Sequence, residues 1–354
     1  MEVTIIDIEL HHVKKPLKKP FKTALQTVIE REGILIRAID DEGVEGYGEC
    51  VAFSTPWYTE ETIAGCRFVL EQVLVPLLLN QTLKSPGQVQ ELFKSIKGNR
   101  MAKAALETAI WDLFAKKQGI PLWKYVGGIN KPIPAGVVVA ADEDKMALQV
   151  EAAVAKGYKR IKLKITPASN TSLLKGFVAR FPDILFFADA NGGFNEGSFS
   201  KLLRFDSIGF ALIEQPFSEK EWQLHARAKK EMKTPICLDE SIHSLEDVQR
   251  MIELEAGDVI VLKMGRLGGW SETLSIVELC RMNGVQMWVG GMIEFGVSKA
   301  HNLALASLPD ISLPGDFSDS DHFWHEDVIE PAIHVKSGEI ALRSENGIGY
   351  NIKF

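Results

Sequence analysis

The sequence lacks the features that mark membrane-spanning, secreted and zinc-binding proteins. Its longest apolar stretch, near Val73 to Leu79, is too short to span a bilayer and contains Pro76. The first four residues have neither the basic start nor the apolar core of a signal peptide. The four cysteines form no C-x-x-C pair, which favours reduced core thiols over a disulfide set or a zinc site. These absences predict a cytoplasmic protein that does not enter a membrane.

Basic stripes and blocks of like charge are also absent. The 354 residues carry a net charge of −7 that is spread along the chain, and no segment interleaves aromatic with basic residues. Nucleic acid is therefore not expected as a partner. His322 and His325 are three residues apart, but no third ligand of matching type accompanies them, so we do not expect a metal there. With 46% hydrophobic and 25% charged residues, the chain is typical of a globular protein longer than one ordinary domain.

Glycine and proline divide the chain into two parts. Residues 3–17 and 34–48 alternate like antiparallel strands, and a helix is expected from Arg100 to Gln118 because Gly119 and Pro121 follow it. Glycine and proline are dense between residues 127 and 134, which predicts a boundary there. We expect an α+β capping domain over residues 1–130, with the tail, residues 318–354, packing back on it.

Short apolar strands alternate with amphipathic helices over residues 131–317. The expected strands are residues 135–140, 160–165, 185–190, 210–214, 235–239, 259–263, 286–290 and 311–314. Eight such strands predict an α/β architecture, a (β/α)7β TIM-like barrel that forms the catalytic domain. A doubly wound open sheet is the alternative, but no G-x-G-x-x-G motif follows the first strand.

Two lysines lie on one face of a single expected strand. Residues i and i+2 of a strand point the same way, so Lys162 and Lys164 project together. Burying two ammonium groups side by side is costly and lowers the pKa of each unless anions lie close by. An exposed edge strand with solvated lysines is the alternative interpretation.

Charged residues recur at the carboxyl ends of the expected strands, where barrel enzymes place their active sites. They are Lys162, Lys164, Asp189, Glu214, Asp239 and Lys263. Three carboxylates on consecutive strands predict a site for a hard divalent cation, and Mg²⁺ suits it because positions remain open for water or substrate. Asn191 repeats the two-residue spacing after Asp189, and Glu240 is expected to support the ligands from outside. The alternative, that each acid caps the following helix, is disfavoured by three equivalent positions.

A cation at these carboxylates also explains the lysines. A neutral amine acts as a base near pH 7 only if its pKa is lowered, as a neighbouring ammonium and a divalent ion would do. Lys164 is the expected base and Lys162 its electrostatic partner, while Lys263 lies about half the circuit of eight strands away. The expected target is a proton α to a carboxylate, because the cation stabilises the enediolate that forms.

Several motifs together resemble the enolase superfamily, in its muconate-lactonizing subgroup. They are Lys162-Leu163-Lys164, Asp189-Ala190-Asn191, Glu214-Gln215-Pro216, Asp239-Glu240-Ser241, and Lys263 with Gly268-Gly269. Residues 290–294 (Gly-Gly-Met-Ile-Glu) and 313–316 (Leu-Pro-Gly-Asp) are similar to those of the o-succinylbenzoate synthase and N-succinylamino acid racemase family. The resemblance covers nearly the whole chain and implies an enolase-type fold with Mg²⁺ or Mn²⁺ as the cofactor.

The resemblance also implies which residues surround the substrate. In this family the first domain closes over the substrate with two loops, here expected around residues 21–27 and 52–58. The implied substrate contacts are Phe21, Phe53, Trp57 and Tyr58 from these loops, and Gly291, Met292, Ile293 and Phe323 from the barrel side. Core packing is the alternative for each aromatic residue.

Three residues bear on the second lysine. Arg266 resembles the arginine of members that racemize, where its charge helps to lower the pKa of Lys263. Val261 stands where the family usually has asparagine, and it cannot donate a hydrogen bond on the face that it shares with Lys263. Met264 follows the lysine where relatives often have proline.

The resemblance implies two activities that share one intermediate. The first is syn-dehydration of a cyclohexadiene carboxylate to o-succinylbenzoate, a menaquinone step, with Lys164 as base and Lys263 stabilising the enediolate. The second is racemization of N-succinylamino or other N-acylamino acids, with Lys164 and Lys263 alternating as base and acid. We expect a small-molecule carboxylate as the partner of the chain, and a homo-oligomer.

Other functions fit the residues less well. Dipeptide epimerization would require Asp-x-Asp in the strand that here carries Gly290 to Met292, and a mandelate-type mechanism would require a histidine near it. A catalytically weak protein that only binds a carboxylate and a metal is an alternative from another class. A barrel enzyme for phosphorylated sugars would not require three metal carboxylates.

Overall fold

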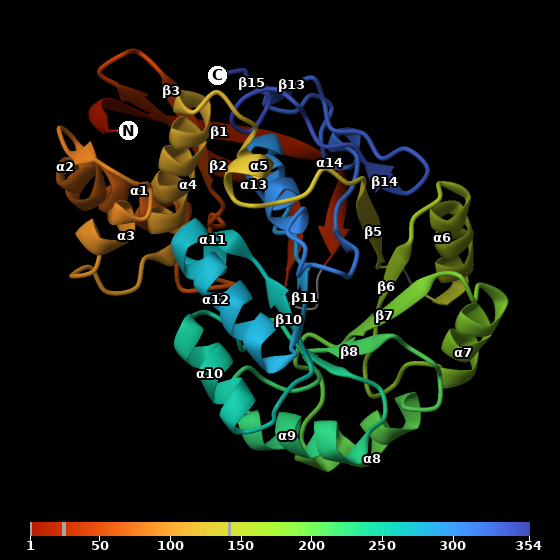
Figure 1. The fold of residues 1–354 in the computed structure, drawn as a ribbon. Coiled ribbons are helices and arrows are strands. Elements are labelled where there is room, and N and C mark those ends of the chain that lie inside the picture. Colours follow the sequence, from red (N-terminus) through yellow and green to blue (C-terminus); the bar gives the residue numbers. More distant parts are fainter. Residues whose placement is uncertain (1, 23–25, 141–142) are drawn as a thin grey trace.

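Two large sheets of different kinds organise the molecule (Figure 1). The computed structural model describes residues 2–22, 26–140 and 143–354. The first sheet is antiparallel, in the order β3-β2-β1-β4. Its strands are β1 (Val3–Lys22), β2 (Thr27–Asp40), β3 (Glu45–Cys50) and β4 (Thr82–Leu83). The helical elements that follow it are α1 (Ile63–Val69), the π-helical turn η1 (Leu70–Leu74), α2 (Val75–Leu78), α3 (Gln88–Leu92), α4 (Arg100–Lys117) and α5 (Leu122–Tyr125).

The predicted strand over residues 34–48 is wrong, because the segment forms parts of two strands joined by a turn. Oδ1 of Asp40 accepts hydrogen bonds from the backbone N–H groups of Glu42 and Val44, and Gly43 has a φ of +80°. An aspartate at the start of a turn and a glycine with positive φ reverse the chain here. The predicted helix over 100–118 is confirmed as α4, with Lys116 and Lys117 in its last turn.

Eight parallel strands form the second sheet, a nearly closed barrel. In the order β12-β5-β6-β7-β8-β9-β10-β11, each strand pairs with the next, and β14 pairs antiparallel with the start of β5 as a ninth strand. The strands are β5 (Ile133–Val139), β6 (Arg160–Lys164), β7 (Leu185–Asp189), β8 (Leu212–Glu214), β9 (Ile236–Leu238), β10 (Val259–Leu262), β11 (Gln286–Val289) and β12 (Gly315–Asp316). The predicted (β/α)7β barrel with an α+β part is thereby confirmed.

Helices surround the barrel on its outer side (Figure 1). They are α6 (Glu143–Ala155), α7 (Thr171–Arg180), α8 (Phe199–Leu202) between the 3₁₀ turns η2 (Glu196–Ser198) and η3 (Leu203–Phe205), α9 (Trp222–Glu231), α10 (Leu245–Glu253), α11 (Met264–Leu267), α12 (Trp270–Asn283) and α13 (Gly296–Ala306). Among the described residues, no helix is long and apolar enough to cross a bilayer. All four cysteines are buried free thiols, as predicted.

The eighth barrel strand lies later in the chain than predicted. We expected it at residues 311–314, but β12 spans Gly315 and Asp316. Ile311 closes a turn, since its N–H donates to the carbonyl of Leu308. Pro314 has no N–H to donate to a sheet, so pairing begins only after it.

The tail contacts the first part of the chain through hydrogen bonds, and it contacts the barrel through the pairing of Glu339 and Ile340 with Pro134 and Ile133. It contains α14 (Ser320–Phe323), β13 (Ile329–Glu330), β14 (Glu339–Ile340) and β15 (Asn351–Ile352). Nζ of Lys15 in β1 donates to the carbonyl of Glu326, and Nε1 of Trp123 donates to that of Arg343. In Figure 1 the blue tail runs beside the red β1. The domain boundary near residue 130 stays a prediction.

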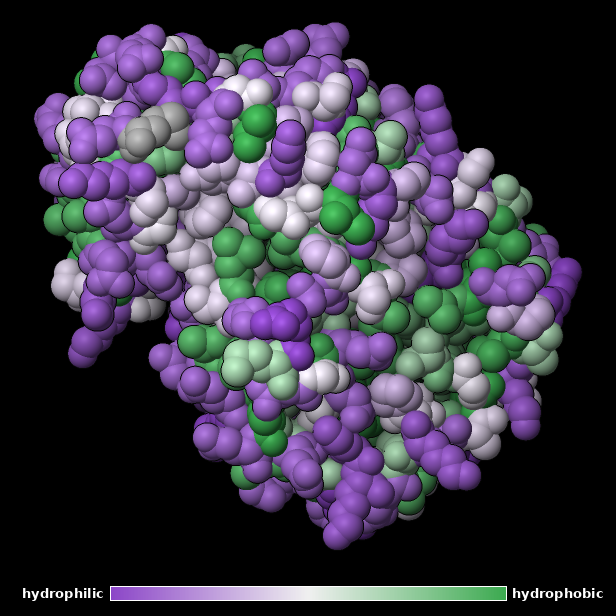
Figure 2. Space-filling model, in the orientation of Figure 1, coloured by the Kyte–Doolittle hydropathy of each residue, from purple (hydrophilic) through white to green (hydrophobic). Residues whose placement is uncertain are grey.

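Polar side chains cover most of the face drawn in Figure 2, while hydrophobic residues gather near its middle. The interior of the barrel is filled by large side chains that include Phe187, Val261 and Trp288. A packed barrel interior is not a channel, so the accessible chemistry is confined to the ends of the strands.

The close approach of β3 to α4 makes a testable prediction. A Cβ atom built on Gly48 would lie 2.1 Å from the carbonyl oxygen of Ala105 in α4. Gly48→Ala should therefore lower the free energy of unfolding by about 1–3 kcal/mol or more, which is the usual cost of overpacking a protein interior. Denaturant unfolding measures this loss.

The matched control is Gly176 in α7, where an added Cβ meets no atom within 4 Å. Gly176→Ala should leave the protein as stable as before or more stable by up to about 1 kcal/mol. Equal effects of the two substitutions would contradict the packing that we describe.

Candidate active site

A cavity of about 410 Å³ opens at the carboxyl ends of the barrel strands and is lined by both parts of the molecule. The predicted residues that line it are Phe21, Phe53, Trp57, Tyr58, Lys162, Lys164, Asp189, Asn191, Asp239, Glu240, Lys263, Gly291, Met292, Ile293 and Phe323. Two further predicted residues, Glu214 and Arg266, lie behind this lining and contact residues in it. The structure thus brings the predicted set together at one place.

The two lysines of β6 do share one face, and each contacts at least one carboxylate. Nζ of Lys164 lies 2.6 Å from Oδ2 of Asp189 and 2.6 Å from Oδ1 of Asn191. Nζ of Lys162 lies 3.2 Å from Oε1 of Glu214 and 3.2 Å from Oδ2 of Asp316. Burial lowers the pKa of Lys162, whereas these two carboxylates and that of Asp189 raise it. The carboxylates outweigh burial, so the net pKa is well above its usual value. Solvated edge lysines are therefore excluded.

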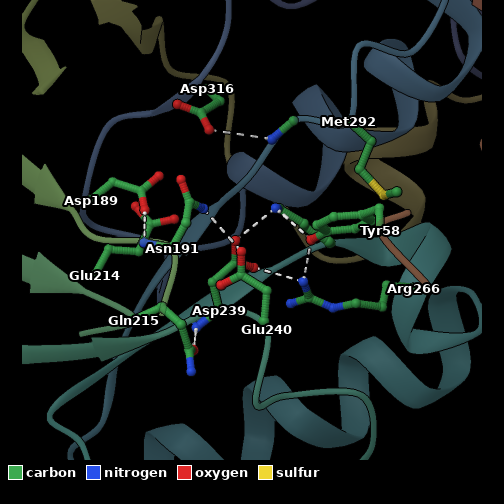
Figure 3. A network of polar contacts seen from close by, with 12 residues as sticks. Tyr58, Asp189, Asn191, Glu214, Gln215, Asp239, Glu240, Arg266, Met292 and Asp316 are labelled. Carbon is green, nitrogen blue, oxygen red and sulfur yellow. Dashed lines mark hydrogen bonds and ion pairs between the residues drawn. The ribbon is translucent and has the colours of Figure 1, made fainter. Parts of the chain in front are cut away.

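A second polar group surrounds Lys263, which follows β10 and lies across the barrel from β6. Figure 3 shows Tyr58, Asp239 and Arg266, which belong to this group. Nζ of Lys263 lies 2.7 Å from Oδ2 of Asp239 and 2.7 Å from the hydroxyl of Tyr58. Nη1 of Arg266 donates to Oδ1 of Asp239 at 2.7 Å and also to the Tyr58 hydroxyl. Tyr58 comes from the loop after β3, so the first part of the chain contributes directly to the polar group around this lysine.

Opposing effects set the pKa of Lys263 in this structure. Burial lowers the pKa of Lys263, but the carboxylate of Asp239 and then Tyr58 raise it, and the net pKa lies above its usual value. Arg266 does act in the expected, lowering direction. The direct ion pair with Asp239 outweighs it, because opposite charges in contact favour the charged amine.

Val261 takes no part in holding Lys263. Its side chain is fully buried in the barrel interior with Trp288. The space is tight, since a Cβ on Gly290 would lie 2.5 Å from Cγ1 of Val261 and 2.9 Å from Cε of Lys263. Asp239 and Tyr58 supply the contacts of the ammonium group instead.

The three predicted metal carboxylates lie at the ends of β7, β8 and just after β9, and all three are almost fully buried. Burial raises the pKa of Glu214, and the nearby carboxylate of Asp189 raises it further, so the net pKa lies well above its usual value. Oε2 of Glu214 accepts no hydrogen bond, although Nζ of Lys162 lies 3.2 Å away as an ion-pair partner. A set of buried carboxylate oxygens fits a hard divalent cation.

The carboxylates do not enclose a cation as they stand. Among residues 2–22, 26–140 and 143–354, no group of three acidic, histidine or cysteine side chains is close enough to hold one. Lys164 and Lys263 pair with Asp189 and Asp239 instead. Neither His322 nor His325 belongs to such a group.

Arg160 and Asp316 belong to the site although the sequence analysis gave them no role. Nη2 of Arg160 lies 2.6 Å from Oδ1 of Asp316, whose Oδ2 contacts Lys162. The guanidinium lies over Trp288, 5.0 Å from the ring centroid, and an added Cβ on Gly136 would lie 2.3 Å from its Nε. The sequence does contain a signal for Arg160. It lies two residues before Lys162 and four before Lys164, so all three share one face of the strand.

Gln215 also has a structural role in the site that the sequence did not predict. It has a φ of +40°, and its Oε1 accepts a hydrogen bond from the backbone N–H of Asp239 at 2.9 Å. Its Nε2 donates to Oγ of Ser241 at 2.8 Å. Gln215 therefore ties the end of β8 to the residue that follows β9. Glu240 is held similarly, since Nδ2 of Asn191 donates to its Oε1 at 3.0 Å.

Aromatic side chains form the outer wall of the cavity. The rings of Phe53 and Trp57 are 4.5 Å apart between centroids, and those of Phe21 and Phe323 are 5.9 Å apart. The end of β1 and the tail helix α14 therefore meet over the cavity. Part of the predicted loop over residues 21–27, namely residues 23–25, lies outside the described residues.

Comparison with known families agrees with this geometry. Residues 5–127 match the model described as "Mandelate racemase / muconate lactonizing enzyme, N-terminal domain". Residues 145–354 match the model described as "Enolase C-terminal domain-like". The chain belongs to the enolase superfamily.

Individual relatives show to which family within the superfamily the chain belongs. An o-succinylbenzoate synthase of Bacillus subtilis (strain 168) is 42% identical over 99% of this chain and 95% of its own length. An N-succinylamino acid racemase of Thermus thermophilus is 40% identical over 98% of this chain and 94% of its own. A solved enolase superfamily member from Listeria innocua Clip11262 superimposes with a TM-score of 0.95, at 37% identity, over 99% of this chain and 95% of that one. Within the superfamily, the chain belongs to the o-succinylbenzoate synthase and N-succinylamino acid racemase family.

The buried ion pair below Lys162 makes a second prediction. Arg160 is fully buried, and Arg160→Met would remove one of the two ion-pair partners that Asp316 has among the described residues and leave it with Lys162. The substitution should cost about 1.5–3 kcal/mol of unfolding free energy, because a buried charge-assisted hydrogen bond is lost.

The exposed Arg227, which pairs with Glu231 and Glu196, is the matched control. Arg227→Met should cost no more than about 1 kcal/mol, as for other surface pairs. A loss for Arg160→Met as small as that for the control would show that the pair does not support the site.

Proposed function

We propose that the protein is a divalent-metal-dependent o-succinylbenzoate synthase, which dehydrates a cyclohexadiene carboxylate in menaquinone synthesis. The observation that carries the proposal is the placement of two lysines on opposite sides of a buried carboxylate set. Lys164 ends β6 and Lys263 follows β10, four strands away in an eight-stranded barrel. Relatives with the printed name o-succinylbenzoate synthase, about 40% identical over the full chain, support the same activity.

Asp189, Glu214 and Asp239 are the proposed ligands of Mg²⁺, with Mn²⁺ as a substitute. When bound, the cation supplies positive charge that stabilises the enediolate formed from the substrate carboxylate. Asn191 and Glu240 orient the ligand groups. Oδ1 of Asn191 accepts a hydrogen bond from Lys164, and Nδ2 of Asn191 donates one to Glu240.

The proton chemistry is assigned to the lysines. Lys164 removes the proton α to the carboxylate and assists departure of hydroxide. Lys162, buried below it with a strongly raised pKa, stays cationic and contributes fixed positive charge. Lys263 stabilises the enediolate from the other side. Its ammonium contacts the hydroxyl of Tyr58, which Arg266 also contacts.

A second activity, racemization of N-succinylamino acids, is favoured by the contacts of Lys263. Racemization requires an acid and a base on opposite faces of the α-carbon, and Lys164 and Lys263 provide one on each side. Arg266 is fully buried against Asp239, which places a fixed positive charge near Lys263. Both activities proceed from the same enediolate, so one site serves both.

The remaining assignments concern the whole protein. We propose a cytoplasmic homo-oligomer in which residues 1–130, with the tail 318–354, form a capping domain and residues 131–317 the catalytic barrel. The hydroxyl of Tyr58 on Lys263 supports the capping role, because it requires the cap to be seated on the barrel.

Lys164→Ala tests the base. Dehydration and racemization should both fall by about 10²–10⁴-fold or more in kcat, because general-base catalysis contributes that much. The substitution should leave stabilisation by Mg²⁺ in place. Lys175→Ala, on the exposed face of α7, is the control and should behave as the unsubstituted protein. Dehydration retained in Lys164→Ala would refute the assignment of the base.

Glu214→Gln tests the metal site without relying on turnover. Mg²⁺ that binds only the folded state raises the thermal midpoint as its concentration increases. We expect this rise in the unsubstituted protein, and a much smaller rise in Glu214→Gln, measured by calorimetry.

The control for this experiment is Glu219→Gln, which changes a half-exposed carboxylate in the lining of the same cavity. It should keep the full response to Mg²⁺. A response in Glu214→Gln equal to that of the control would exclude Glu214 as a ligand.

A further inference from the structure

Four lysines line the cavity, and three of them are paired with carboxylates. Lys162 and Lys164 contact Asp189, and Lys263 contacts Asp239. The fourth is Lys299. Across the described ranges of the chain, no carboxylate oxygen lies within 4.0 Å of its ammonium nitrogen, so it alone among these four lacks an ion-pair partner.

Lys299 is held in place although its charge is uncompensated. It lies in the first turn of α13 and is only 3% exposed. Nζ donates one hydrogen bond, to the carbonyl oxygen of Ser318 at 3.2 Å. An ammonium group has three N–H donors, so two remain for another acceptor. Burying an unpaired ammonium is costly, which indicates that an anion binds beside it in the working protein.

The acidic residue nearest in sequence to Lys299 is already engaged elsewhere. Glu294 lines the same cavity, but its oxygens accept hydrogen bonds from the backbone N–H of Met292 and from Nδ2 of Asn302. The charge of Lys299 is felt at the cavity rim: burial and then Lys299 lower the pKa of His322. Burial and the charge of Lys299 therefore both favour the neutral form of His322.

We propose that Lys299 binds the remote carboxylate of the succinyl chain of the substrate. This inference rests on the proposed function and extends it by assigning a second anion subsite. The substrate carboxylate next to the reacting carbon belongs with the metal carboxylates and Lys162, at the ends of β6 to β9. Lys299 and Ser318 lie on another wall, after β11 and β12, where a second carboxylate would reach them.

A single subsite for the succinyl carboxylate explains how one cavity serves two substrates with different bodies. A cyclohexadiene carboxylate and an amino acid share no ring, but both proposed substrates carry a succinyl group. An acyl group without a carboxylate would leave Lys299 buried and unpaired, and would bind more weakly for that reason.

The test compares two ligands that differ only at the succinyl carboxylate. They are o-succinylbenzoate and the analogue in which this carboxylate is a carboxamide of nearly the same shape. Calorimetry on the Mg²⁺-loaded protein gives both dissociation constants without turnover. We expect the carboxamide to bind about 10- to 100-fold more weakly, the effect of losing one charge-assisted hydrogen bond in a buried site.

Lys299→Met should bind the acid and the carboxamide equally. The matched control is Lys131→Met, because Lys131 also donates to backbone carbonyls, those of Leu308 and Ile311, but does not line the cavity. It should keep the full preference for the acid. Equal binding of the two ligands by the unsubstituted protein would overturn the proposal even if Lys299→Met fails to fold.

Two other results would overturn it: no binding of o-succinylbenzoate at all, or an unchanged preference in Lys299→Met. Failure of the proposed function looks different. Absence of turnover on either substrate, together with an acid preference that depends on Lys299, would remove the function and leave the anion subsite. Normal turnover without any preference would remove the subsite and leave the function.

Discussion

Paired buried charge at the mouth of the barrel is the constraint on which the rest of the structure depends. Asp189, Glu214 and Asp239 are almost fully buried and near enough that Asp189 raises the pKa of Glu214. Carboxylates in such a place are tolerated only with cations in contact. Lys162, Lys164 and Lys263 provide these contacts. The same groups are the ones to which we assign the metal and the proton transfers, so the stability of this region and its chemistry have one physical origin.

The layers around this centre hold its charges in position. Beneath it, Arg160 and Asp316 fix Lys162 from the barrel interior. Beside it, Gln215 joins the ends of β8 and β9 through the backbone of Asp239. Above it, Tyr58 reaches from the cap to Lys263. Tyr58 belongs to the first part of the chain. Removal of the cap would therefore remove a contact of a proposed catalytic group and would also expose the cavity to water.

Sequence reasoning predicted the barrel because its signals are local. The strands are short and apolar, the five consecutive strands β6 to β10 end in or are followed directly by a charged residue, and the same-face rule placed Lys162 and Lys164 together. It failed where the outcome depends on neighbours far apart in the chain. The position of β12 after Pro314 depends on pairing with β5, and the ion pair of Arg160 depends on Asp316, 156 residues away. Only the folded structure shows that Asp239 contacts the ammonium of Lys263 directly, which raises the pKa of Lys263.

The most direct test of the central claim is the kcat/KM for dehydration of the menaquinone-pathway cyclohexadiene carboxylate, measured with Mg²⁺, after chelation, and after Mg²⁺ is restored. The account predicts a kcat/KM of about 10⁴ M⁻¹ s⁻¹ or more with the cation, as for an ordinary enzyme on its own substrate. It predicts that chelation abolishes this activity and that Mg²⁺ restores it. Turnover that survives chelation would contradict the role given to the three carboxylates. Absence of turnover with both this acid and N-succinylamino acids would contradict the proposed chemistry itself.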